Sequence, residues 1–124
     1  MKQIIVLLLL IMSIKTSYAQ TISASDYLDS GNEKYETNDY NGAIADFTKA
    51  IAINPNDADA YSNRGLSKSH LLDYEGSIAD FTKAIAINPN DAYAYNNRGL
   101  SKHNLKNYYG AIADFNKAIE INPN

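Results

Sequence analysis

A unit of 34 residues recurs three times in this chain, and this repeat limits the folds open to the sequence more than any other feature. Segment 40–57 differs from segment 74–91 at two positions only. A unit this short cannot bury its apolar face alone, so it is stable only when it is stacked on its neighbours. We therefore predict one repeat domain over residues 20–124. Its units are residues 24–57, 58–91 and 92–124, with the motif Asn-Pro-Asn at 54–56, 88–90 and 122–124.

Each unit carries the patterns of two helices. In the second half of the first unit, Ala43, Phe47 and Ala50 lie at helical spacing and form one apolar stripe. Asn54 stands before a proline, a place that disfavours helix, and Asp57 suits the N-cap of the next helix. No segment alternates with a period of two residues, so no strand is predicted. The sequence predicts an all-α fold with six helices in the repeat domain.

This pattern resembles the tetratricopeptide repeat family over residues 24–124. The resemblance implies an α-solenoid, a right-handed superhelix of three helix-turn-helix repeats preceded by a signal peptide. The glycine and the small residue of each repeat let two helices approach closely, and the aromatic side chains fill the space around that contact. In the first repeat the matching residues are Tyr27, Gly31, Tyr40, Ala43, Phe47, Ala50 and Pro55, and they return 34 and 68 residues later except that Ser77 replaces the first alanine.

The first nineteen residues have the pattern of a secretory signal peptide. A basic start precedes an apolar run over residues 4–12, and small residues follow at Ser17 and Ala19. We predict cleavage between Ala19 and Gln20 and export to the periplasm or to the outside medium, as in a bacterial secreted member of the family. An uncleaved membrane anchor is the alternative, but a span needs about 20 apolar residues and Lys15 ends the run early.

Without those nineteen residues the chain has nine basic and fourteen acidic residues, a net charge of −5. No segment is basic enough to attract nucleic acid or an anionic membrane. The absence of cysteine excludes disulfides, thiolate metal sites and a cysteine nucleophile. Two histidines, His70 and His103, are too few for a metal site, and no nucleophile lies in an activating motif. We predict a protein that is not an enzyme and has no cofactor.

The family resemblance also implies that the first helices line a concave face, which binds an extended or helical peptide of a partner protein. Amides and aromatic rings at the matching positions suit such a groove, although an ordinary solvated helix face is the alternative. The family's clamp for C-terminal carboxylates is not predicted, because its cationic places hold residues such as Leu28 and Tyr93. The predicted partner-binding residues are Asn32, Tyr35, Asn63, Leu66, His70, Tyr93, Asn97, Leu100 and His103.

Arg64 and Arg98 occupy a place that the family usually gives to an apolar residue, and aspartates recur on the second helices. The first repeat has a serine in place of the arginine, which suggests that each arginine pairs with an aspartate of the preceding repeat. We predict structural ion pairs of Asp46 with Arg64 and of Asp80 with Arg98, which leave Asp114 without a partner. A ligand-binding pair of arginines is the alternative.

The last second helix has an apolar stripe that no further helix of the sequence covers. Terminal repeats usually have a solvated outer face. Self-association through this end, docking of a partner and truncation of the gene product all remain open. The predicted function is a protein-interaction module, and the alternative is a structural element that forms homo-oligomers through this end. The residues predicted for the end are Tyr109, Ile112, Phe115 and Ile119.

Overall fold

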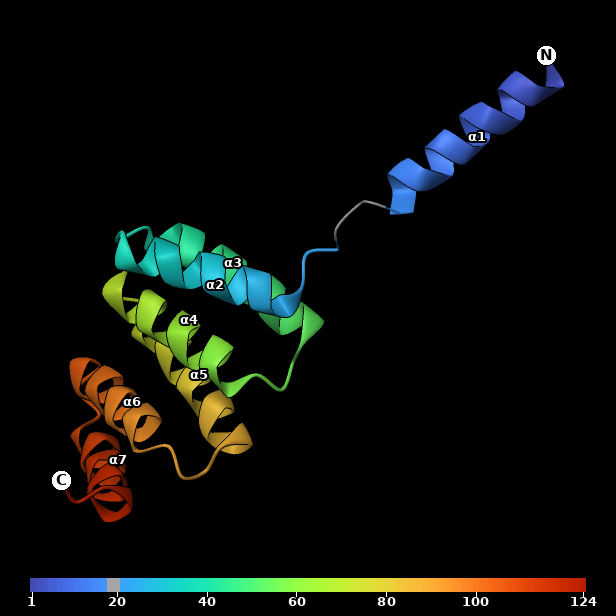
Figure 1. The fold of residues 1–124 in the computed structure, drawn as a ribbon. Helices are drawn as coiled ribbons and strands as arrows, with labels where there is room; N and C mark the ends of the chain where they lie inside the picture. The colour runs from blue at the N-terminus through green and yellow to red at the C-terminus, as the bar shows by residue number, and fades with distance from the viewer. Residues whose placement is uncertain (18–20) are drawn as a thin grey trace.

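The computed structural model describes residues 1–17 and 21–124, and these residues form seven helices and no strand (Figure 1). The predicted all-helical fold is confirmed. There is one helix more than the six predicted, because residues 2–17 are also helical, and the predicted cleavage site between Ala19 and Gln20 lies outside the described residues. The helices are α1 (Lys2–Ser17), α2 (Ala24–Glu36), α3 (Tyr40–Ile53), α4 (Ala58–His70), α5 (Tyr74–Ile87), α6 (Ala92–Asn104) and α7 (Tyr108–Ile121).

The apolar helix α1 stands apart from the other helices (Figure 1). It makes no helix-to-helix contact with α2 to α7, and its isoleucines and leucines from Ile4 to Ile11 are exposed. Within the described ranges, no helix combines the length and the apolar character that crossing a membrane requires. The packed part of the molecule therefore consists of α2 to α7.

Side-chain caps define where the helices begin. The carboxylate of Asp39 accepts a hydrogen bond of 3.0 Å from the backbone nitrogen of Gly42, and Asp73 and Asn107 cap α5 and α7 in the same way. Asp57, predicted as a cap, accepts hydrogen bonds from two backbone nitrogens at the start of α4. Each cap satisfies N–H groups that have no partner inside the helix. The recurring Asp and Asn residues therefore give the repeats matching helix starts.

Consecutive helices pack as antiparallel pairs, α2 with α3, α4 with α5 and α6 with α7, and each pair packs on the next (Figure 1). The first helices also touch one another, α2 with α4 and α4 with α6. Among the described helices, no such contact joins α3 to α5 or α5 to α7. The first helices are therefore closer together than the second helices, so the stack curves with α2, α4 and α6 on its inner side.

Phenylalanines and small residues fill the space within and between the pairs. Phe47 and Phe81 are completely buried. A Cβ atom built on Gly31 would lie 2.5 Å from Phe47 Cε1, so this close approach of α2 to α3 requires glycine. The equivalent Gly65 lies against Phe81, where a Cβ would be 3.2 Å from the ring. The packing role predicted for these glycines is confirmed.

Candidate functional site

The inner face of the stack has a pair of amide side chains near its first two helices. Asn63 Nδ2 on α4 donates to Asn32 Oδ1 on α2 over 2.9 Å, and both side chains are half-buried. Asn97 holds the equivalent place on α6, but its Nδ2 donates to the backbone oxygen of Tyr93 over 2.9 Å. The structure thus brings two of the three predicted asparagines together. Each amide keeps a donor or acceptor that the backbone of a bound peptide can use.

An aromatic cluster lies at the turn end of the same face. His70 stacks on Tyr40 with ring centroids 4.4 Å apart, and Tyr35 meets the two rings edge-on at 5.5 and 5.6 Å. The Tyr35 hydroxyl lies 3.0 Å from His70 Nε2. Burial raises the pKa of Tyr35, and Tyr93 and Tyr40 raise it further, so the phenol stays protonated at neutral pH. The predicted residues Tyr35 and His70 meet, whereas the sequence pattern assigned Tyr40 to packing alone.

The other predicted groove residues differ in exposure. Tyr93 and Leu100 on α6 are 54% and 46% exposed, so both offer apolar surface to a ligand. His103 meets Tyr108 edge-on with ring centroids 5.4 Å apart. Leu66 packs against the buried cluster between α5 and α6, so part of its surface belongs to the core. Over residues 1–17 and 21–124, no three His, Cys or acidic side chains gather as metal ligands would.

The predicted pairing of aspartates with arginines is wrong. Arg64 binds Asp80 instead of Asp46, with Nε–Oδ2 and Nη2–Oδ1 distances of 2.9 and 2.7 Å. Arg98 binds Asp114 through the same pair of atoms at the same distances, so Asp114 does have a partner. Each arginine pairs within its own repeat, because the antiparallel helices of a repeat bring residues 16 positions apart into contact.

A lysine one turn after each arginine binds the same aspartate. Lys68 Nζ lies 2.9 Å from Asp80, and Lys102 Nζ lies 2.8 Å from the aspartate of the third repeat. In the first repeat, Lys34 and Ser30 both donate over 2.6 Å to the equivalent carboxylate. Sequence analysis missed these lysines, although their recurrence at 34-residue spacing was a usable signal. Every lysine and arginine of the first helices is thus bound to a buried aspartate, namely Lys34, Arg64, Lys68, Arg98 and Lys102.

The arginines also connect neighbouring repeats. Arg64 Nη1 donates to Thr48 Oγ1 on α3 over 3.1 Å, and Arg98 Nη1 donates to Thr82 Oγ1 on α5 over 3.2 Å. The arginines therefore reach across the repeat boundary as predicted, but to a hydroxyl and not to a carboxylate. Their positive charge is directed toward the second helices and away from the inner face.

We predict that acid weakens the third repeat through Asp114. Burial raises the pKa of this carboxyl, but hydrogen bonds from Arg98 and Lys102 outweigh burial and hold the pKa below its ordinary value. A carboxyl with a lowered pKa stabilises the fold above the pKa of the unfolded chain, and this stability is lost as the pH falls through the folded-state pKa. Asp114→Asn should therefore lower the free energy of unfolding at pH 7 and have little effect at about pH 2.

Urea unfolding of the parent and of Asp114→Asn at both pH values measures this difference. Glu75→Gln, which changes an exposed carboxylate on α5, is the control and should behave as the parent does. An equal loss of stability in Asp114→Asn at both pH values would show that the charge of Asp114 contributes nothing.

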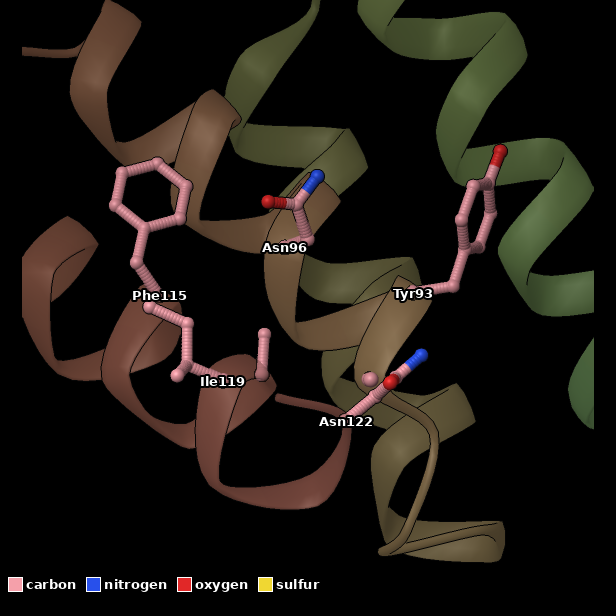
Figure 2. A pocket seen from close by; sticks show the side chains of 7 residues that line it. Tyr93, Asn96, Phe115, Ile119 and Asn122 are labelled. Atoms are coloured by element: carbon pink, nitrogen blue, oxygen red, sulfur yellow. The ribbon is translucent and has the colours of Figure 1, made fainter. Parts of the chain in front are cut away.

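A pocket of about 510 Å³ opens between α6 and α7 at the C-terminal end of the stack (Figure 2). Figure 2 shows Phe115, Ile119 and Asn122 close to Asn96, whereas the ring of Tyr93 points away from Phe115. The pocket lies apart from the amide pair on α2 and α4. Its lining residues are Ala92, Tyr93, Asn96, Phe115, Ala118, Ile119 and Asn122.

Two of the four residues predicted for the open end, Phe115 and Ile119, line this pocket. Ile119 is 60% exposed, whereas the equivalent Ile85 is 9% exposed because α6 covers it. Ile112 and Tyr109 are also exposed but lie outside the pocket lining. The face predicted to be uncovered is therefore uncovered in the described part of the chain.

Solved structures with the same architecture cover most of this chain. The TPR domain of OM64 from Arabidopsis is 31% identical, with a TM-score of 0.80 over 82% of this chain and 84% of that one. The first TPR domain of Spaghetti (RPAP3), bound to the HSP90 peptide SRMEEVD, is 25% identical with a TM-score of 0.81 over 82% and 81%. The TPR2B domain of yeast Sti1, in a complex with pHsp70, is 30% identical with a TM-score of 0.77 over 79% and 78%.

Sequence comparison separates the family from the individual protein. No curated protein sequence matches this chain significantly. A family model described as TPR repeat matches residues 31–68 and 73–106, and one described as tetratricopeptide repeat matches residues 92–124. These matches include every helix from α3 to α7 and most of α2. The chain belongs to the tetratricopeptide repeat family.

Proposed function

We propose that this protein is a protein-interaction module that holds a peptide or a helix of a partner protein against the inner face of α2, α4 and α6. The observation that carries the proposal is the amide pair of Asn32 and Asn63, which lies on that face beside the ring cluster of Tyr35 and His70. Two of the similar structures hold peptides from other proteins or a complex with one. The proposal includes no catalytic activity, no cofactor and no nucleic-acid partner.

The charges of the inner helices indicate which peptides suit this face. All five lysines and arginines of α2, α4 and α6 bind aspartates on the second helices, so none is free to bind a carboxylate of a ligand. The exposed acidic residues Asp29 and Asp59 lie on the same helices. Because charge-assisted bonds need the opposite charge, we propose that the bound peptide is neutral or basic.

A library of random peptides displayed on phage tests this proposal without knowledge of the partner. Asn63→Ala removes an amide of the pair, and Leu100→Ala removes exposed apolar surface from α6. We expect each change to weaken an enriched peptide about tenfold, which corresponds to about 1.4 kcal/mol. Tyr93 is left intact because it also lines the C-terminal pocket.

Lys83→Ala is the matched control, since Lys83 is exposed on α5 away from the inner helices. It should leave the dissociation constant within about twofold of the parent value. The proposal is wrong if the library yields no binder, or if every binder is as sensitive to Lys83→Ala as to Asn63→Ala. Enrichment of strongly acidic peptides would contradict the charge argument alone.

We also infer that residues 1–19 direct export and are removed before Gln20, so that the folded unit acts in a periplasm or outside the cell. The apolar, exposed helix α1, which packs on none of α2 to α7, supports this proposal. The mass of the protein recovered from an expressing bacterium distinguishes a chain that starts at Gln20 from one that starts at Met1.

Association through the outer face of α7 is the second candidate function, and a homo-oligomer is its simplest form. The observation that favours it is the exposure of Ile119, which is buried at the equivalent place in the second repeat. Light scattering over a hundredfold range of concentration measures self-association directly.

A further inference from the structure

The outer face of α7 repeats a surface that holds a helix twice elsewhere in this chain. In the first two repeats this surface is covered, by α4 on α3 and by α6 on α5. In the third repeat the same residue types border the open pocket. The residues in order of repeat are Phe47, Ala50 and Ile51, then Phe81, Ala84 and Ile85, then Phe115, Ala118 and Ile119.

The two covered surfaces show what a fitting helix must carry. Ala60 of α4 and Ala94 of α6 are completely buried, and Ala94 lies in one cluster with Phe81 and Ile85. A tyrosine follows each alanine, and Tyr95 packs against the same cluster.

Four residues after each buried alanine comes the arginine that donates to a threonine of the supporting helix. Both helices therefore share the sequence Asp-Ala-X-Ala-Tyr-X-Asn-Arg, which begins at Asp57 and at Asp91.

The chain's own free first helix, α2, departs from this sequence at both contacts. Asp26 stands where α4 and α6 have the buried alanine, and Ser30 stands where they have the arginine. The Asp26 carboxylate is already bonded over 2.8 Å to Ser23, as part of the cap of α2. A second copy stacked head to tail would place this carboxylate against Phe115 and Ile119, and burying an unpaired charge against apolar side chains is unfavourable.

We propose that the pocket between α6 and α7 is a docking site for the first helix of a tetratricopeptide unit in a different protein. That helix carries alanine and tyrosine against Phe115 and Ile119. Its arginine donates to the amide oxygen of Asn116, which stands where the covered surfaces have Thr48 and Thr82. This site is separate from the peptide-binding face, so either can exist without the other.

A peptide with the sequence of residues 90–105 of this chain is the probe, because it copies α6 together with its cap. A lactam staple on the face opposite Ala94 keeps it helical, and fluorescence anisotropy measures its binding to residues 21–124, which contain all the helices that pack together. We expect saturable binding, with at least tenfold weaker binding when the peptide carries Ala94→Asp. Ile119→Asp in the protein should weaken binding by a similar factor.

Ile53→Asp is the matched control in the protein, since Ile53 is 54% exposed and lies on α3 away from the pocket. It should leave binding unchanged. Equal affinity for the parent peptide and its Ala94→Asp form, or no binding of either, overturns the proposal. A molecular mass that rises with concentration and returns to the monomer in Ile119→Asp also overturns it, because the pocket is then an interface between copies.

Discussion

Phe81→Ala should lower the free energy of unfolding by about 4 kcal/mol. Phe81 is completely buried and lies in the cluster that joins α5 to α6, with Ile85 and Ala94 as neighbours. Gly65 brings α4 against the same ring from the other side. The change therefore removes the transfer free energy of a whole ring and leaves a cavity where three helices meet. Because a domain of this size has roughly 5 to 15 kcal/mol of stability, the loss is a large part of the total.

Phe115→Ala is the matched control for this prediction. Phe115 holds the same place in the third repeat, but it borders the open pocket and is only partly buried. Less of its ring leaves water on folding, so we expect roughly half the loss seen for Phe81. Urea unfolding followed by circular dichroism measures both variants. Equal losses would mean that a further helix, or a second copy, covers the pocket in solution.

The second large effect is expected from Asp80→Ala, which should cost about 3 kcal/mol. Asp80 is 3% exposed, and its carboxylate binds Arg64 through two hydrogen bonds and Lys68 at 2.9 Å. Removing the carboxylate leaves two positive charges close together without their counter-charge. Breaking a buried pair at one side is costly for this reason, even where the intact pair adds little net stability.

A triple variant separates these two contributions. Replacing Asp80, Arg64 and Lys68 together by leucine removes the uncompensated charges, so most of the stability lost in Asp80→Ala should return. Glu75→Ala, on the exposed side of α5, should change the free energy of unfolding by less than about 0.5 kcal/mol. A loss in Asp80→Ala as small as this would show that the network is exposed to water in solution.

The helices and their core were predictable because the same pattern occurs three times, with Phe47, Phe81 and Phe115 at one place in each repeat. The partners of the buried aspartates were not predictable from spacing. Asp80 on α5 follows Arg64 by 16 residues and precedes Arg98 by 18, and both α4 and α6 touch α5. Only the direction in which the carboxylate points decides between these two arginines, and sequence spacing does not contain that direction.

The inner face was predictable as a set of positions but not as a set of contacts. Helical spacing places Asn32, Asn63 and Asn97 on one side, yet only the first two form a hydrogen bond with each other. Leu66 shares that side but packs partly into the core, because the neighbouring α5 and α6 provide apolar surface there. Rotations of individual side chains depend on such neighbours, which a single helix does not reveal.

The central claim is that α2, α4 and α6 together form the surface that binds a partner's peptide. Amide chemical shifts of labelled residues 21–124, recorded while a phage-selected peptide is added, test it most directly. We predict that the shifts change at Asn32, Asn63 and Leu100 and stay constant at Lys83 and Ile53 on the second helices. Changes concentrated on α3 and α5, with none on the three first helices, would contradict the claim.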